Sequence, residues 1–208
     1  DHIYESGLKK DFKDNIELKE GWYNTISNSL ETAVDVIRST EFTELYIRFA
    51  LKYASFVTIY GGTDLYDKIE LIYSDIFSAL NDHLRNNNTT LMAYALRSYA
   101  MLCYYRNNID LCVVKLVRAQ EICRNKIYDN TEQTLVNVDY MNEYILATRN
   151  LADVFFDSIG EERRDRNRSA KEYKDIVEKY SHLTVVDQSL DYNYDFVYHV
   201  YKRLAILS

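Results

Sequence analysis

The sequence predicts an all-α protein. It contains no proline and only five glycines among 208 residues, and 47% of its residues are hydrophobic. A β-sandwich of this length needs many more turn residues, whereas helices joined by short loops do not. Apolar residues also recur every three or four positions, which is the spacing of one face of a helix. We therefore expect an array of helices rather than a sheet.

Helices are expected along nearly the whole chain. The clearest apolar stripes begin at Trp22 and at Leu65, and each continues for about four turns. Residues that tolerate turn backbone separate the stripes. These breaks are expected at Gly21, Gly61-Gly62, asparagines 86–88, Asn107-Asn108, Asn130 and Gly160. The expected helices span 4–19, 22–38, 42–59, 64–84, 90–106, 109–126, 134–158, 163–180 and 190–207.

A single domain is expected over residues 1–208, because no linker rich in glycine, serine or proline divides the chain. The chain is acidic, with 25 basic and 32 acidic residues and a net charge of −7. Nucleic acid requires a net basic face, so we expect no nucleic-acid partner. No apolar run approaches the roughly 20 residues of a membrane span, so we expect no membrane partner either.

A cytoplasmic location is expected from the cysteines and from the first residues. Cys103, Cys112 and Cys123 form no CxxC pair, which is typical of buried, reduced thiols. The segment Asp1–Glu5 lacks the features of a signal peptide.

The sequence gives no spacing typical of an enzyme or a metal site. Histidines 2, 83, 182 and 199 show no HExxH or paired spacing, so no metal is expected. Cys103 could act as a nucleophile, but the sequence places no base or oxyanion donor beside it. We therefore expect neither catalysis nor a cofactor.

Residues 93–126 resemble one tetratricopeptide unit. No second copy follows at that repeat's period of about 34 residues. The pattern leaves one alternative open, a tetratricopeptide-type helical scaffold that binds unphosphorylated protein partners. The residues near the repeat's positions are Leu96, Ala100, Asn107, Asp110, Leu116 and Ala119.

Blocks in the same order resemble the 14-3-3 family. Residues 71–84, LIYSDIFSALNDHL, are similar to that family's fourth-helix pattern LIxxDILxxLDxHL. Residues 119–122, AQEI, match the end of its sixth helix, and residues 150–157, NLADVFFD, resemble its seventh-helix NFSVFYYE. The resemblance implies about nine antiparallel helices that form a concave groove. In that family the groove binds phosphoserine or phosphothreonine peptides.

The resemblance also implies which residues bind the peptide. Residues 44–52 align with the family's RNLLSVAYK, so Lys52 takes the position of a phosphate-binding lysine. Arg97 takes the position of the fifth-helix arginine, and Asn150 that of the asparagine that holds the peptide backbone. A dianionic phosphate needs several cationic donors of this kind.

Some pocket positions depart from the family. Ile59 replaces a third-helix arginine, and Ser98 replaces the tyrosine that accompanies the fifth-helix arginine. Tyr99 lies about 100° further around the helix, so we do not expect it to substitute. Asp157 stands where the family has a glutamate, and Arg203 where it has an asparagine.

The apolar wall of the groove is also altered, by Arg149, Asp153 and His199. Arg48 adds a cation one turn before Lys52. Two interpretations stay open. Either Arg48, Lys52 and Arg97 partly rebuild the phosphate pocket, or they line a solvated groove that binds no phosphopeptide.

The sequence thus predicts an adaptor that binds phosphorylated proteins through an altered pocket. A homodimer is left open, because the hairpin between the expected third and fourth helices is much shorter than the family's. The predicted phosphopeptide-binding residues are Lys52, Arg97, Asn150, Arg48, Asp157 and Arg203.

Overall fold

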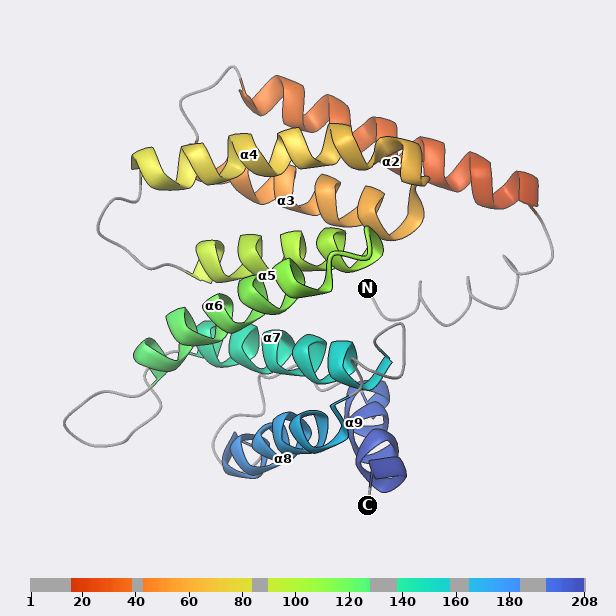
Figure 1. The fold of residues 1–208 in the computed structure, drawn as a ribbon. Coiled ribbons are helices and arrows are strands. Elements are labelled where there is room, and N and C mark those ends of the chain that lie inside the picture. Colours follow the sequence, from red (N-terminus) through yellow and green to blue (C-terminus); the bar gives the residue numbers. More distant parts are fainter. Residues whose placement is uncertain are drawn as a thin grey trace. The chain divides into compact units, whose positions relative to one another are not determined.

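The chain is helical wherever the structure describes regular elements. These residues form eight α-helices and one short 3-10 helix, and no strand occurs among them (Figure 1). The prediction of an all-α protein is confirmed. The helix expected over 4–19 lies mostly outside the described residues. The computed structural model describes residues 16–38, 43–83, 90–127, 138–157, 165–183 and 194–207.

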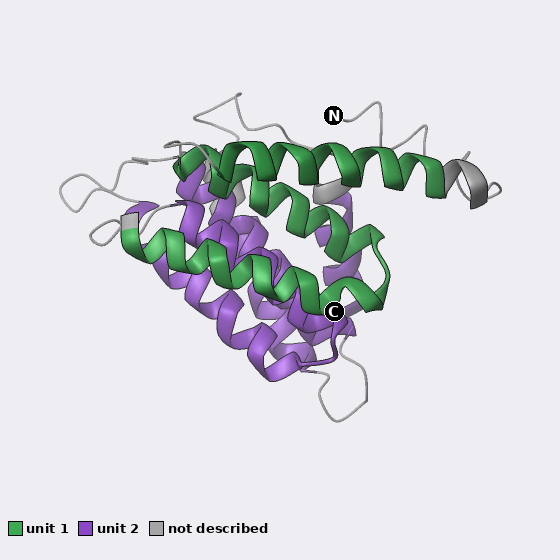
Figure 2. Cartoon of the chain, turned by 90° about the horizontal axis from the view of Figure 1, so that it is seen from above, with its two compact units in different colours: residues 1–83 green, residues 84–208 purple. Residues whose placement is uncertain are grey.

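The chain divides into two compact units, residues 1–83 and 84–208 (Figure 2). The expectation of a single domain over 1–208 stays a prediction. In the first unit, α3 packs against both α2 and α4. Lys68 of α4 donates to Glu31 of α2 at 2.5 Å, which ties these two helices together. The elements of this unit are α2 (Ile16–Arg38), α3 (Thr43–Tyr60), η1 (Thr63–Leu65) and α4 (Tyr66–His83).

The break predicted at Gly21 is wrong, because α2 continues through this residue. The Gly21 carbonyl accepts a bond from Thr25 Oγ1 at 2.8 Å, within an unbroken helix. A glycine costs only about 1 kcal/mol relative to alanine inside a helix. The helical residues on both sides of Gly21 therefore outweigh its turn preference.

The break predicted at Gly61 and Gly62 is confirmed. The Gly61 N–H donates to the Val57 carbonyl at 2.8 Å and ends α3. A Cβ atom at Gly61 would lie 2.5 Å from that carbonyl oxygen, so only glycine fits this close approach.

The second unit is a series of helices in which each packs against the next, and α5 also contacts α7 (Figure 1). Asn107, at φ 58°, makes the tight turn between α5 and α6, as the asparagine pair predicted. Its helices are α5 (Thr90–Tyr105), α6 (Ile109–Ile127), α7 (Val138–Asp157), α8 (Arg166–Leu183) and α9 (Tyr194–Leu207).

An apolar cluster fills the space between α5, α6 and α7. It contains Cys103 and Cys112, and Cys123 is buried as well. Burial raises the pKa of the Cys112 and Cys123 thiols to about 12, which keeps them protonated and unreactive. The prediction of buried free cysteines is confirmed. The other members of the cluster are Ala100, Ile109, Leu116, Leu151, Val154 and Phe155.

Helix α8 begins and ends three residues later than the predicted 163–180. Asp165 caps its first turn, since its Oδ1 atom accepts the Arg168 N–H at 2.9 Å. The cap therefore fixes the beginning of the helix at Arg166, within the arginine-rich stretch 163–168. The breaks expected at asparagines 86–88, Asn130 and Gly160 lie outside the described residues.

Alanine substitution should have opposite effects at two of the glycines. Gly21→Ala should stabilise the protein by about 0.5–1 kcal/mol, because nothing lies within 4 Å of the added Cβ and alanine favours the helix. Gly61→Ala should destabilise it by about 1–3 kcal/mol, because the Cβ overlaps the Val57 carbonyl. Urea unfolding followed by circular dichroism measures both changes in the free energy of unfolding. Equal changes in the two variants would contradict the different surroundings of Gly21 and Gly61.

Candidate functional site

The two cations predicted on α3 belong to the first unit. Lys52 is exposed, and no described residue makes a hydrogen bond or ion pair with it. Arg48 donates from Nε and Nη2 to Glu44 Oε1 at 3.0 and 2.9 Å. Ile59, which the resemblance aligns with an arginine, is exposed near the end of the helix. Among the described residues, Arg48 of this pair meets a carboxylate and Lys52 does not.

Arg97, on α5, is held by an acidic residue of α7. Its guanidinium donates to both carboxylate oxygens of Glu143, at 2.8 and 3.2 Å. Each side chain is only 17% exposed. The Arg97 guanidinium also lies over the Tyr94 ring, 5.1 Å from its centroid. A ligand phosphate at Arg97 would therefore have to displace a mostly buried carboxylate.

The neighbours of Arg97 do not complete a phosphate site around it. Ser98 is buried. The Tyr99 ring lies against the ammonium group of Lys115 on α6, with 5.5 Å between the nitrogen and the ring centroid. Whether Tyr99 takes the role of the tyrosine in the resemblance stays a prediction.

Asn150 is half-buried on α7, seven residues after Glu143. No hydrogen bond joins its side chain to another described residue. An amide side chain can both donate and accept hydrogen bonds.

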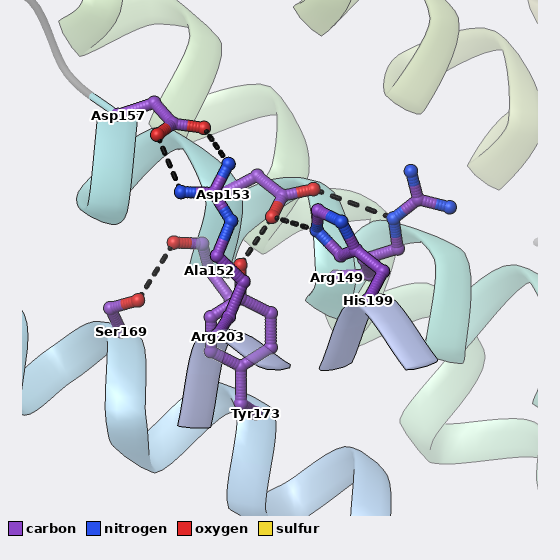
Figure 3. A network of polar contacts seen from close by, with 8 residues as sticks. All are labelled: Arg149, Ala152, Asp153, Asp157, Ser169, Tyr173, His199 and Arg203. Carbon is purple, nitrogen blue, oxygen red and sulfur yellow. Dashed lines mark hydrogen bonds and ion pairs between the residues drawn. The ribbon is translucent and has the colours of Figure 1, made fainter. Parts of the chain in front are cut away.

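Three predicted departures from the family form one polar network (Figure 3). Asp153 Oδ1 lies 2.8 Å from His199 Nε2 of α9, and Asp153 Oδ2 accepts from Arg149 Nε at 3.4 Å. Tyr173 of α8 also donates its hydroxyl to Asp153 Oδ1. Burial, and then the nearby Asp153 carboxylate, raises the pKa of Tyr173. Asp153 thus joins three helices.

A second ion pair lies one turn further along α7. Arg203 of α9 donates through both terminal nitrogens to the two Asp157 oxygens, each at 2.7 Å (Figure 3). The guanidinium lies 4.0 Å from the centroid of the Phe156 ring. Two carboxylates spaced by four residues on α7 therefore meet two basic side chains spaced by four residues on α9.

Further polar contacts fasten α6, α7 and α8. Gln120 Nε2 lies 2.9 Å from Thr148 Oγ1 and 3.1 Å from Glu172 Oε2. Tyr144 donates its hydroxyl to Asp175 at 2.6 Å. These bonds satisfy polar groups between the helices and fix how the helices pair.

The structure thus separates the predicted site residues into groups. Lys52 and Arg48 belong to the first unit, whereas Arg97, Asn150, Asp157 and Arg203 belong to the second. Asp157 and Arg203 bind each other, and Arg97 binds Glu143.

Sequence analysis missed Glu143 and Tyr173. Ser169, Tyr173 and Ile176 have the spacing of one α8 face and are all buried. That stripe could have marked Tyr173 as a polar group that needs a buried partner. Nothing in the sequence pairs Glu143 with Arg97, because the two residues are 46 positions apart.

In the part of the chain that the structure describes, no cluster of three or more histidine, cysteine or acidic side chains could hold a metal ion. No helix of that part combines the length and apolar character needed to span a bilayer.

Comparisons of the chain with models of protein families, with curated proteins and with solved structures find no match. Inferences about function therefore depend on the contacts described above.

Removing one partner of the Arg97–Glu143 pair should cost more stability than removing both. Arg97→Met leaves the Glu143 carboxylate mostly buried without its cation and should lower the free energy of unfolding by about 2 kcal/mol. The double variant Arg97→Met/Glu143→Met should lose less, because no unpaired charge remains. Urea unfolding of the unchanged protein, of Arg97→Met, of Glu143→Met and of the double variant measures the coupling, and additive losses would contradict it.

Tyr173 should make stability fall at high pH. Its raised pKa means that the folded protein keeps a proton which the unfolded chain releases above about pH 10. The stabilisation is therefore present below that pH and is lost as pH rises further. Tyr173→Phe should show a shallower fall in the free energy of unfolding between about pH 9.5 and 11. Tyr198→Phe, which removes an exposed tyrosine, is the matched control; identical slopes for all three proteins would refute the assignment.

Proposed function

We propose that this chain is a non-enzymatic adaptor whose helical array binds unphosphorylated segments of other proteins, as a tetratricopeptide-type scaffold does. The observation that supports this proposal most directly is the Arg97–Glu143 ion pair. In this pair the Glu143 carboxylate already binds the guanidinium that a phosphate would need. The ligand is therefore recognised by other groups of the array.

The arrangement of the second unit favours this class of function. Its helices pack in chain order, each against the next, as in helical scaffolds that present extended binding surfaces. The α5–α6 hairpin has the buried small and apolar residues Ala100, Leu116 and Ala119, near positions of the tetratricopeptide pattern. Asn107 makes its turn with left-handed backbone.

The charges of the second unit also disfavour a phosphate clamp there. Breaking a buried ion pair by withdrawing one partner typically costs about 3–5 kcal/mol, and partial exposure lowers that figure. A phosphate at Arg97 would have to repay this cost and also lie near the displaced Glu143 carboxylate. Arg149 and Arg203 likewise face the carboxylates of Asp153 and Asp157.

A second candidate is the phosphoserine- or phosphothreonine-binding adaptor of 14-3-3 type, with about nine helices around a concave groove. Lys52 and Asn150 favour it, because neither has a polar partner among the described residues. Lys52 would bind the phosphate, and Asn150 the peptide backbone. The offset charge of Arg48 and the paired Arg97 would leave such a pocket weak.

The proposal includes a cytoplasmic location and protein partners, with no cofactor, nucleic acid or membrane. Three free, buried cysteines agree with a reducing compartment. The net charge of −7 agrees with the absence of a nucleic-acid ligand.

Phosphate dependence of binding separates the two candidates. An array of fluorescent peptides, each prepared with serine and with phosphoserine, is screened for binding by anisotropy. The scaffold proposal predicts ligands that bind at least as well without phosphate, because Arg97 stays with Glu143. Lys52→Glu should change the affinity for the unphosphorylated peptides by less than about twofold, because these peptides carry no phosphate for Lys52 to bind.

Binding of the phosphorylated peptides alone, abolished by Lys52→Glu, would overturn the scaffold proposal and support the second candidate. Binding of no peptide in either form would overturn both. Ser78→Glu, which places an acidic residue on the exposed side of α4, is the control for a general effect of added negative charge.

A further inference from the structure

Helix α9 buries few of the side chains that the structure describes. Among its described side chains, from Tyr198 to Leu207, Val200 is the only one that is buried. Tyr198, Tyr201 and Ile206 are more than half exposed. Burial of apolar surface therefore contributes less to the docking of this part of α9 than it does for α5 or α6.

The polar contacts of α9 with α7 follow a regular spacing. His199 meets Asp153 and Arg203 meets Asp157, so the same spacing of four residues separates the basic groups on α9 and the acidic groups on α7. All four side chains are partly exposed, between 22% and 40%. Such contacts are charge-assisted, but they remain open to exchange with salt and with competing cations.

The surface of α7 beneath α9 is built to receive basic side chains. Asp157 offers both oxygens to a guanidinium, and the Phe156 ring lies beneath that guanidinium. Arg149 contacts one oxygen of Asp153 and Tyr173 donates to the other, so these groups hold the carboxylate toward His199 (Figure 3). The Asp153 carboxylate is thus oriented by contacts that do not depend on α9.

We propose that α9 is a releasable intramolecular ligand, and that the α7 surface around Asp153 and Asp157 binds basic helical segments of partner proteins. Such a segment carries two basic side chains one turn apart, in the places of His199 and Arg203. This inference rests on the proposed adaptor function and names its partner class: α9 blocks the surface until a basic helix displaces it.

The full chain with His199→Glu/Arg203→Glu tests this inference. Those changes place acidic groups opposite Asp153 and Asp157, so α9 should leave the surface. The probe is a fluorescein-labelled peptide with the sequence of residues 194–207. Anisotropy should show the probe binding at least about tenfold more tightly to the variant than to the unchanged protein, since the Asp153 and Asp157 carboxylates become available to its two basic side chains.

Two controls examine the chemistry of that binding. The same peptide with both basic residues replaced by glutamate should not bind the variant. Adding Asp153→Asn and Asp157→Asn to the variant should abolish binding of the unmodified probe. Equal affinity of the probe for the variant and the unchanged protein, or undiminished binding in either control, would overturn the proposal.

Hydrogen exchange of the unchanged protein provides a measurement that does not depend on variants. Raising the salt concentration from about 0.05 to 0.5 M should accelerate amide exchange in α9 several-fold, while α6 exchange stays constant. Salt-independent exchange in α9 would contradict a releasable helix. Binding of library peptides without binding of the α9 probe would reject only this inference, whereas failure of both would reject the adaptor function as well.

Discussion

The second unit depends on how the acidic residues of α7 are neutralised. Glu143 faces Arg97 of α5, Asp153 faces His199 of α9, and Asp157 faces Arg203 of α9. An isolated carboxylate is costly to remove from water, and α5, α8 and α9 each supply a cation or a donor to one of these carboxylates. This requirement links the packing of α5, α8 and α9 to a few side chains of one helix.

The same requirement limits what the chain can bind. A cation that neutralises a partly buried carboxylate is not available to a ligand unless the ligand replaces that carboxylate. Glu143, which binds Arg97, is 17% exposed, whereas Asp157, which binds Arg203, is 40% exposed. We propose that the chain recognises protein segments through the charged side chains of α7, and that a basic segment competes at the Asp157 end of that helix.

Sequence patterns predicted the helices because apolar periodicity, the missing prolines and the asparagine turns all act locally. Gly21 shows the limit of such patterns, since its turn preference is smaller than the tendency of the surrounding residues to form a helix. For the site, the residues Arg149, Asp153, His199 and Arg203 were identified singly. Their mutual contacts, and the roles of Glu143 and Tyr173, could not be predicted, because ion pairs across 46 positions depend on which helices meet.

The central claim is that the Arg97 guanidinium is bound by the Glu143 carboxylate and not by a ligand. The Arg97 Nε–H resonance, observed by 15N-edited NMR, tests this claim most directly, because Nε donates to Glu143 at 2.8 Å. The account predicts a slowly exchanging signal that does not move when a phosphoserine peptide is added, and that shifts in Glu143→Gln. A signal that exchanges rapidly with water, or one that moves on titration with the phosphopeptide, would contradict it.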